Sequence, residues 1–396
     1  MSGRGRAGVL GASLLVVLYV VIGGLLGRTA SEGAYRQLAV FSEVLSRIQS
    51  DYVEEPNLPR VTAGALRGLL SELDPYSSYL APREYAEYQQ KQGQAEGEVG
   101  AVLSKRFGLV SVVTVLPGSP AARAGLQTGD ILESIAGFST REMSLEQARI
   151  LLGGEPGTSV KVAVVRQNRP DPQESELVRA RLRPLRVLAA RLEGGVSYLK
   201  IAAFSPGTTE EVRAALRPLA AGGAAKLVLD LRDAATGTVE EAVETARLLL
   251  PSGLITYSQG QQAPRQQFTA EPGAQLWSGP VTVLINRGTA GPAEILAAAV
   301  LENKRGEVIG QRSYGIASVQ KLIALDDGSA LILTVAKYYS PSGKAIQDVA
   351  VTPSLPVEAP EGQALVPLPH QPPSADDPVL RKALEVLASE PAGKAA

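Results

Sequence analysis

The sequence predicts a multidomain α/β protein. Beyond residue 186, β-rich runs such as VSYLKIAAF and KLVLDL alternate with helical patterns, which is typical of a mostly parallel sheet with helices packed on it. Between residues 97 and 185, short β-rich runs separated by turn residues predict a second, β-rich domain. The chain has 396 residues, which is enough for two or three domains with a core each.

Composition argues against several classes of function. The chain has no cysteine, so it has no disulfide, thiol nucleophile or thiolate metal site. Its formal net charge is -1 and its basic residues are scattered, so nothing indicates a nucleic-acid partner. The single histidine, His370, lies in a Pro-rich segment, which argues against a Ser-His-Asp triad and against a metal centre. We therefore expect no metal and no cofactor.

The N-terminus predicts a membrane anchor over residues 1–28. Residues 7–27 form an uncharged apolar run preceded by Arg4 and Arg6, and a helix of that length spans a bilayer. A cleaved signal peptide is the alternative, but the run is longer than a usual signal core and no small-x-small site follows it. With the arginines inside, we expect a single-pass protein of the cell inner membrane whose bulk is periplasmic or otherwise extracytoplasmic.

Residues 29–96 predict a helical region. Apolar residues recur at helical spacing on both sides of a break at Pro56 and Pro59, which indicates a helical hairpin. The motif DPYSSYL and a Gly- and Gln-rich stretch then lead into the β-rich domain.

Residues 97–185 resemble a PDZ domain of the bacterial type. The resemblance rests on PGSPAARAGL, a GDIL strand, a capped helix from Ser144 and a strand at 160–165. Such a fold adds a peptide as a strand to an open sheet edge and captures its terminal carboxylate with backbone N–H groups. The alternative is a domain that serves only for packing and whose groove binds no peptide. The resemblance implies a peptide-binding groove formed by Gly97, Val99, Gly100, Ala101 and Val102, with Ala148 and Leu152 facing the last apolar side chain.

Residues 186–356 predict the α/β core. Helices are expected at about 208–221, over TVEEAVETARLLL and over AEILAAAVLEN, between the strands KLVLDL, VTVLIN, EVIGQR, SVQKLIAL and ALILTVAKYY. Residues 357–396 are expected to form a Pro-rich tail with a short terminal helix at about 378–387.

The order of these parts resembles the carboxyl-terminal processing peptidases, also called tail-specific proteases. The closest stretches are DYVEEPNL, LDPYSSYL, LVLDLR, LLLPSGL, VIGQRSYGIASVQ, DGSALILTVAKYYSPSGKAIQ and VTPSL. The resemblance implies a ClpP/crotonase-like α/β peptidase core. It also implies a nucleophilic serine in Ser-Ala-Ser-Ala-Ser-Glu-Ile at a helix start and a lysine base in Phe-Gly-Lys-Gly-x-x-Gln.

Both of these catalytic positions are altered. The first motif reads GTAGPAEI, which places Gly291 at the nucleophile position, and the second reads YGIASVQ, which places Ile316 at the base position. Glycine has no side-chain oxygen to attack a carbonyl, and isoleucine cannot accept a proton. Of the catalytic set only Gln320 remains, together with Glu294 at the helix start.

The turn after the DLR strand departs as well. The family's oxyanion turn reads roughly Gly-Asn-Pro-Gly-Gly, whereas this chain has residues 233–237, DAATG. A β-branched threonine at the first glycine of the Gly-Gly pair crowds the approach of backbone N–H groups to an oxyanion. Three separate parts of one site are therefore changed together.

Several residues could substitute for the lost groups. Thr289 is the candidate substitute nucleophile, although it lies before the helix start and catalysis tolerates little displacement. The alternative for Thr289 is a structural role, in which its hydroxyl stabilises the turn. Ser313, Ser318 and Lys321 flank the base position, and surface or edge roles are favoured for them.

Three hypotheses follow. The first is a membrane-anchored extracytoplasmic pseudopeptidase that binds protein or peptide C-terminal tails, with an active protease relative as a further partner. The second is a working serine-type endopeptidase with a displaced nucleophile. The third is a structural envelope scaffold.

Overall fold

The computed structural model describes residues 37–91, 97–106, 108–141, 143–166, 169–221, 226–358, 374 and 376–389. The chain divides into two compact units, Met1–Leu66 and Arg67–Ala396. The anchor expected over residues 7–27 lies outside the described residues. Within the ranges given above, the protein has no helix that is both long and apolar enough to cross a bilayer.

The first unit is helical. A helix covers residues 37–51, and α2 (Leu58–Ser71) begins in this unit and continues into the next. The break between them contains Pro56, as the sequence indicates, whereas Pro59, also assigned to the break, lies in the first turn of α2. Neither helix builds a core: α2 has no buried residue, and Leu38 and Val44 of the first helix are exposed.

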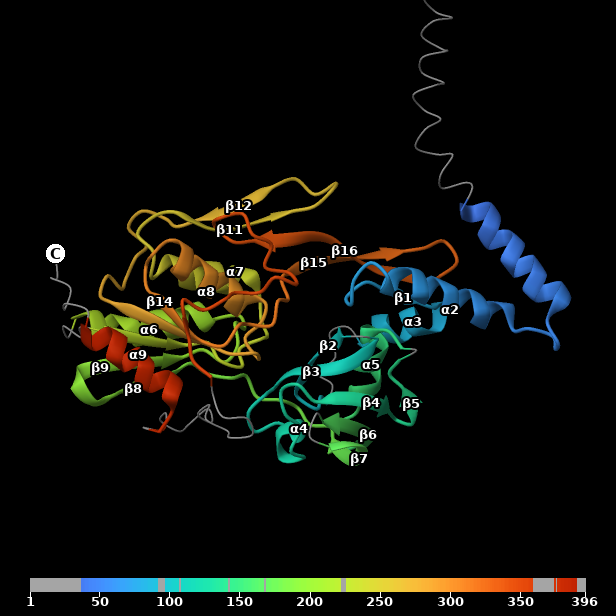
Figure 1. Ribbon diagram of the computed structural model, residues 1–396, viewed down its shortest axis with the longest axis horizontal. Helices are drawn as coiled ribbons and strands as arrows, with labels where there is room; N and C mark the ends of the chain where they lie inside the picture. Colours follow the sequence, from blue (N-terminus) through green and yellow to red (C-terminus); the bar gives the residue numbers. More distant parts are fainter. Residues whose placement is uncertain are drawn as a thin grey trace, which may run out of the picture. The chain divides into compact units, whose positions relative to one another are not determined.

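The β-rich domain is an antiparallel sheet covered by short helices (teal to green in Figure 1). Its main path runs β2 (Ala101–Arg106), β3 (Leu109–Val115), β4 (Ile131–Ile135), β6 (Ser159–Arg166) and β7 (Arg169–Val178), with β5 (Phe138–Ser139) beside β4. The helices are α4 (Pro120–Arg123) and α5 (Leu145–Leu152). A capping box fixes the start of α5: Gln147 N donates to Ser144 Oγ at 3.1 Å, and Ser144 N donates to Gln147 Oε1 at 2.8 Å.

The central sheet of the α/β core is mostly parallel. In spatial order it contains β17 (Leu355–Pro356), β14 (Glu307–Gly310), β13 (Val281–Ile285), β10 (Lys226–Asp230), β9 (Val196–Lys200) and the antiparallel edge strand β8 (Leu188–Arg191), which the turn η1 (Glu193–Gly195) joins to β9. Successive residues point to opposite faces, so Leu199 joins one hydrophobic core and Tyr198 the other. This sheet is the framework on which the site is built.

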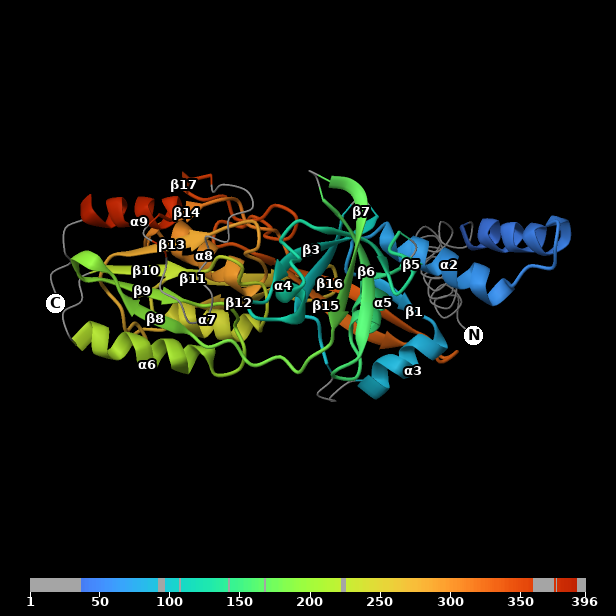
Figure 2. The same ribbon diagram turned by 90° about the horizontal axis from the view of Figure 1, so that it is seen from below.

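Helices cover both faces of that sheet (Figure 2). One core contains residues of α6 (Thr208–Ala221), α7 (Val239–Arg247) and α8 (Pro292–Glu302). The other contains Val379, Leu380, Ala383 and Leu387 of α9 (Pro378–Ser389), the helix expected in the C-terminal tail. This helix is therefore an integral layer of the core rather than a loose end.

A buried ionic cluster ties α9 to the sheet. Arg232 donates to Asp377 Oδ2 at 2.6 Å and to Asp230 Oδ2 at 2.6 Å, and all three side chains are 3 % exposed or less. Asp377 also caps α9 by accepting from Val379 N at 3.0 Å. Burial alone would raise the pKa of Asp230, but the charges of Arg232 and Lys200 bring it well below its usual range.

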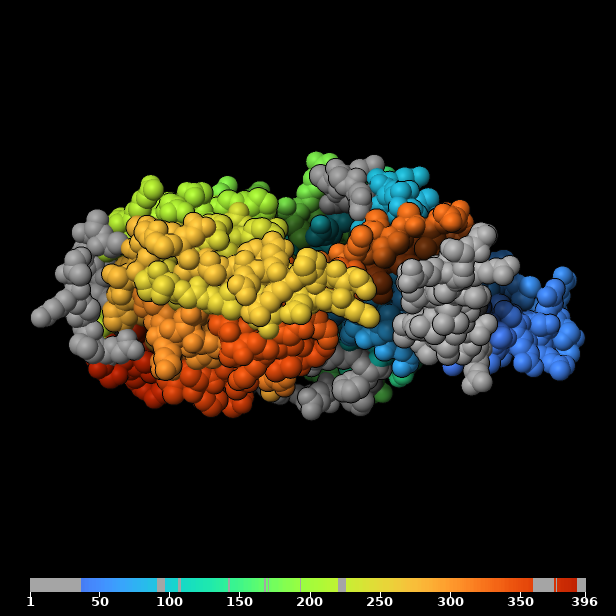
Figure 3. Space-filling view, turned by 90° about the horizontal axis from the view of Figure 1, so that it is seen from above, coloured from blue at the N-terminus to red at the C-terminus, as the bar shows by residue number. Residues whose placement is uncertain are grey.

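A further sheet extends from the core. It contains β1 (Ser78–Leu80), β16 (Ala330–Tyr339), β11 (Leu254–Gln259) and β12 (Gln266–Thr269), with β15 (Ser318–Ala324) along β16, and α3 (Pro82–Lys91) follows β1. In the space-filling view the β11–β12 hairpin forms a yellow ridge on the core's outer surface (Figure 3). Strand β15 begins two residues after Ile316, so this sheet fixes the direction of the base segment.

Candidate peptidase site and peptide groove

Three segments from different parts of the chain meet at the candidate site. They are the turn after β10, the start of α8 and the loop before β15. A side chain at position 291 would place its Cβ 3.6 Å from the carbonyl oxygen of Ile316 and 3.9 Å from that of Ala235. The structure therefore brings together the three positions at which the sequence departs from a catalytic pattern.

A buried carboxylate joins two of these segments. Glu294 Oε2 accepts from the backbone N–H of Gly291 and of Ile316, both at 2.9 Å. Its Oε1 accepts from Gly315 N at 2.7 Å and from the Ser313 hydroxyl. One side chain thus holds the nucleophile position and the base position together.

Two effects act on the charge of Glu294 in opposite directions. Burial disfavours the ionised form of the side chain, and its hydrogen bonds favour that form. The side chain is completely buried, and this burial raises the pKa of Glu294 to about 7 despite the four donors around it. An ionised carboxylate can accept all four hydrogen bonds, whereas a protonated one must use an oxygen as a donor. The geometry therefore suits the charged form, at an energetic cost.

The turn after β10 is fixed by Asn286. Its side chain accepts from Asp233 N at 2.9 Å and donates to Asp233 Oδ1 at 2.9 Å. Asp233 adopts a left-handed φ of 59°, and a Cβ at Gly288 would lie 2.3 Å from Asp233 Oδ1. Only glycine fits at position 288, so the two hydrogen bonds between Asn286 and Asp233 depend on it.

The backbone is strained at the start of α8. Gly291 has φ 60° and ψ -122°, a conformation that residues with a side chain rarely adopt. The next residue, Pro292, has no backbone N–H. In strand-to-helix turns that carry a nucleophile, the N–H of the residue after the nucleophile stabilises the oxyanion. Position 292 therefore offers no backbone donor at this turn.

Thr289 holds the loop and does not point to a free cleft. Its hydroxyl donates to the carbonyl of Leu231 at 2.9 Å and accepts from Asn286 N at 3.0 Å. The residue is completely buried. This geometry favours the turn-stabilising role over that of a displaced nucleophile.

The residues around the base position lie on strands β15 and β16. Gln320 is exposed and donates to Ser318 Oγ at 2.8 Å, and Lys321 is exposed beside it. Lys337 is the cross-strand partner of Ser318 and pairs with Asp348 at 3.8 Å. Lys337 could not be singled out from the sequence, because only the strand register brings it next to this segment.

No metal centre is evident in the part of the chain that the structure describes. There, no three His, Asp or Glu side chains come close enough to hold an ion. His370 lies outside the described residues.

The β-rich domain carries a groove beside β2. β2 pairs only with β3, and its other edge lies along a cavity of about 560 Å³ that also borders α5. The residues of the expected groove that line this cavity are Gly97, Val99, Gly100, Ala101, Val102 and Leu152. Ala148 does not line it: α5 turns that residue into the domain core, where it is completely buried. Glu146, Arg149 and Ile150 form the helix wall instead.

Two backbone amides of the expected carboxylate loop are already used. Gly97 N donates to Gly154 O at 2.7 Å, and Glu98 N donates to Ala180 O at 2.9 Å. The next two amides, of Val99 and Gly100, have no acceptor among the described residues. Gly100 has φ 78°, and a Cβ there would lie 2.2 Å from the Cβ of Ser119, so glycine is required.

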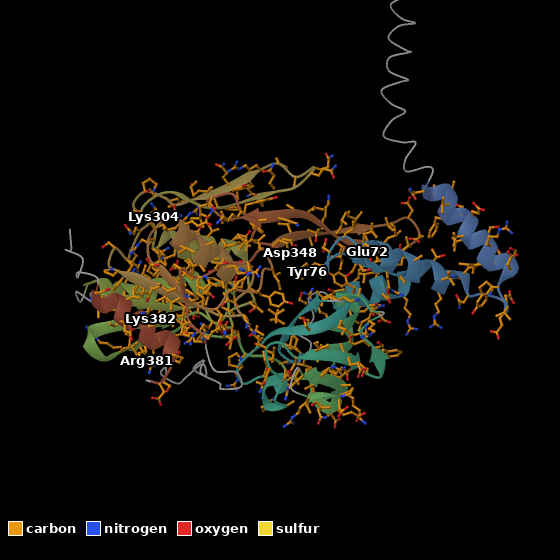
Figure 4. All side chains as sticks on the ribbon, in the orientation of Figure 1. Glu72, Tyr76, Lys304, Asp348, Arg381 and Lys382 are labelled. Carbon is orange, nitrogen blue, oxygen red and sulfur yellow. The ribbon has the colours of Figure 1, made fainter. Side chains whose placement is uncertain are left out.

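The β2–β3 hairpin also contacts the segments of the candidate site. Thr114 Oγ1 donates to Asp233 O at 3.4 Å, and the hydroxyls of Ser111 and Tyr314 are 3.4 Å apart. Tyr76, labelled in Figure 4 near Asp348, bonds Ser104 of the same hairpin at 2.9 Å. Burial raises the pKa of Tyr76 above its usual value, and nearby negative charge, including that of Asp348, adds to the rise. The groove and the candidate site therefore lie next to each other.

Comparison with known proteins identifies the family. The chain is 31% identical to a carboxy-terminal-processing protease of Bartonella bacilliformis over 89% of its own length and 82% of the relative's. It is 33% identical to a carboxyl-terminal-processing protease of Synechocystis sp. over 79% and 75%. The chain belongs to peptidase family S41. The S41 family model matches residues 195–357, and a PDZ domain model matches residues 111–166.

A solved structure agrees with this assignment. The photosystem II D1 C-terminal processing protease superposes with a TM-score of 0.68 at 28% identity, covering 81% of this chain and 92% of that one. The protein is thus a PDZ-containing member of a family of C-terminal processing serine proteases. Its α/β architecture is the one that the sequence predicted.

Proposed function

We propose that this S41 family member is a pseudopeptidase, anchored in the membrane and facing away from the cytoplasm, that binds protein C-terminal tails without cutting them. The observation that carries the proposal is the meeting of Gly291 and Ile316 at the two positions where a nucleophile and its base are expected. Position 291 has no nucleophilic atom and position 316 has no proton acceptor.

The losses at the site add up to more than one missing residue. Removing a nucleophile or its base each lowers kcat by orders of magnitude, and what remains in such variants comes from the oxyanion donors and substrate binding. Here the donor after position 291 is absent because of Pro292, and Thr236 occupies the oxyanion turn. Little residual catalysis is expected.

Tail binding is supported by the open edge of β2. A peptide can extend the sheet there, and the amides of Val99 and Gly100 are available for its carboxylate. Arg149 places a positive charge on the wall of the same cavity, although Glu146 lies 3.3 Å from it. The edge of β2 that would bind a tail does not include the two altered positions, Gly291 and Ile316.

The proposed location rests on residues 7–27. An anchor there would hold the groove near membrane proteins and near an active protease relative. Such a relative could cut what this protein holds or shields.

The test uses the full-length chain and one pair of peptides. A fluorescein-labelled ten-residue peptide with an apolar last residue is titrated as the free acid and as the C-terminal amide, with anisotropy as the readout. The proposal expects saturable binding of the acid, at least tenfold weaker binding of the amide, and intact peptide by mass spectrometry afterwards. Equal affinity for acid and amide would rule out carboxylate capture. No binding would favour the scaffold hypothesis.

A further inference from the structure

The cavity beside β2 has a wall that does not belong to the PDZ domain. Besides the segment from Gly97 to Leu103, it is lined by Ala235, Thr236 and Gly237 of the turn after β10. In an active relative this turn would serve the oxyanion. In this chain it borders the groove in which a tail would lie.

The backbone of this turn is held firmly. Phe204 N donates to Thr236 O at 2.8 Å, and Thr238 N donates to Phe204 O at 2.8 Å. A Cβ at Gly237 would lie 2.1 Å from Phe204 O, so the chain passes too close for any other residue. The turn is therefore a fixed wall and not an adaptable loop.

The side chain of Thr236 is left free by these contacts. It is half-buried, and its hydroxyl has no hydrogen-bond partner among the described residues. Thr238, two residues on, instead caps α7 by accepting from Glu241 N at 3.3 Å and does not line the cavity. The hydroxyl of Thr238 thus caps a helix, whereas the hydroxyl of Thr236 makes no hydrogen bond within the described residues.

We propose that Thr236 is a specificity-determining residue of the tail groove, selecting tails with a small last side chain. This inference rests on the proposed tail binding. A carboxylate held at Val99 and Gly100 brings the last side chain of the tail between α5 and the turn. The β-branched threonine narrows that space, whereas a glycine at 236 would open it.

The experiment measures a ratio of affinities with the full-length chain. Two fluorescein-labelled ten-residue peptides, identical except for a last residue of Ala or Phe, are titrated as free acids and as amides. The native chain is expected to prefer the Ala tail. Thr236→Gly should shift the Ala-to-Phe ratio of dissociation constants toward Phe by at least about fivefold, as expected for space gained in an apolar pocket.

Two further variants make the result specific. Thr236→Val keeps the branched shape without the hydroxyl and should keep the native ratio. Thr238→Gly is the matched control, because it makes the same change outside the cavity at a cap position that glycine tolerates. It should also keep the native ratio.

The outcomes distinguish the proposed role of Thr236 from the proposed tail binding on which it rests. If free acids bind more tightly than amides but Thr236→Gly leaves the ratio unchanged, the role of Thr236 is refuted and tail binding stands. If acids and amides bind alike but Thr236→Gly shifts the ratio, the wall is supported and carboxylate capture is refuted. If Thr238→Gly shifts the ratio equally, the role of Thr236 is refuted. If neither peptide binds the native chain, both proposals are refuted.

Discussion

Glu294 offers a sharp test of how the site is held together. Glu294→Gln replaces an acceptor of four hydrogen bonds by an amide whose nitrogen cannot accept. With its nitrogen in the place of Oε2, the amide leaves Gly291 N and Ile316 N without an acceptor. With its nitrogen in the place of Oε1, it leaves Gly315 N without an acceptor, while the Ser313 hydroxyl can turn and accept from the amide. Each buried unsatisfied donor costs about 1–3 kcal/mol, so the variant loses roughly 1–6 kcal/mol of this bonding.

The pH dependence isolates the carboxylate. With a folded pKa of about 7 against an ordinary 4.5, Glu294 binds its proton more tightly in the folded state. Its stabilising contribution is complete below pH 4.5 and is lost as the pH rises through 7. Between pH 5 and pH 8 the native chain should therefore lose about 2–3 kcal/mol through this carboxyl alone. Glu294→Gln should lack that loss.

The assay is urea unfolding of the full-length chain at the two pH values. Trp277 is the only tryptophan and is 1% exposed in the core, so its fluorescence reports on the unfolding of this domain. Glu302→Gln, at the other end of α8, controls for loss of a carboxylate on the same helix. A Glu294→Gln variant with the native pH profile would refute the role given to this side chain.

Three other changes test the surrounding structure. Asp377→Ala removes the cap of α9 and a buried partner of Arg232, and should lower the free energy of unfolding by about 3–5 kcal/mol in the same assay; a loss below about 1 kcal/mol would contradict it. Ala350→Gly should raise stability by about 0.5–1 kcal/mol, measured as a higher Tm, because Ala350 has a left-handed φ of 62°; a lower Tm would contradict that. Thr289→Ala leaves the backbone N–H of the half-buried Asn286 without its acceptor and should cost about 1–3 kcal/mol, and a stability equal to the native chain's would argue against its turn role.

The fold was largely predictable because its signals are local. Periodicity placed α6 and α8 close to their observed bounds, and the KLVLD and EVIG runs form largely buried parallel strands. Gly291 and Ile316 were assigned to the two catalytic positions by aligning their segments with the family's motifs. That the two residues lie side by side follows from the fold and could not be read from the sequence. The sequence predicted α9 as a helix but not its packing against the central sheet. Arg232, which pairs with Asp377 at the start of α9, is distant in the chain.

The details of the site depended on contacts that leave little trace in the sequence. The sequence placed Glu294 at the start of a helix, yet its four donors come from two segments. The placement of Ala148 was wrong, since the phase of α5 about its axis decides which side chains face the groove. The wall formed by Thr236 requires the turn after β10 to lie against the PDZ domain, and no sequence pattern reports that.

The central claim is that this scaffold no longer cuts peptide bonds. The most direct measurement is the rate at which the full-length chain degrades an unfolded protein with an apolar C-terminus, with fragments identified by mass spectrometry. The account predicts no cleavage above the buffer rate. Cleavage by the native chain that disappears in Thr289→Ala or in Lys337→Ala would contradict it and would identify a displaced catalytic centre.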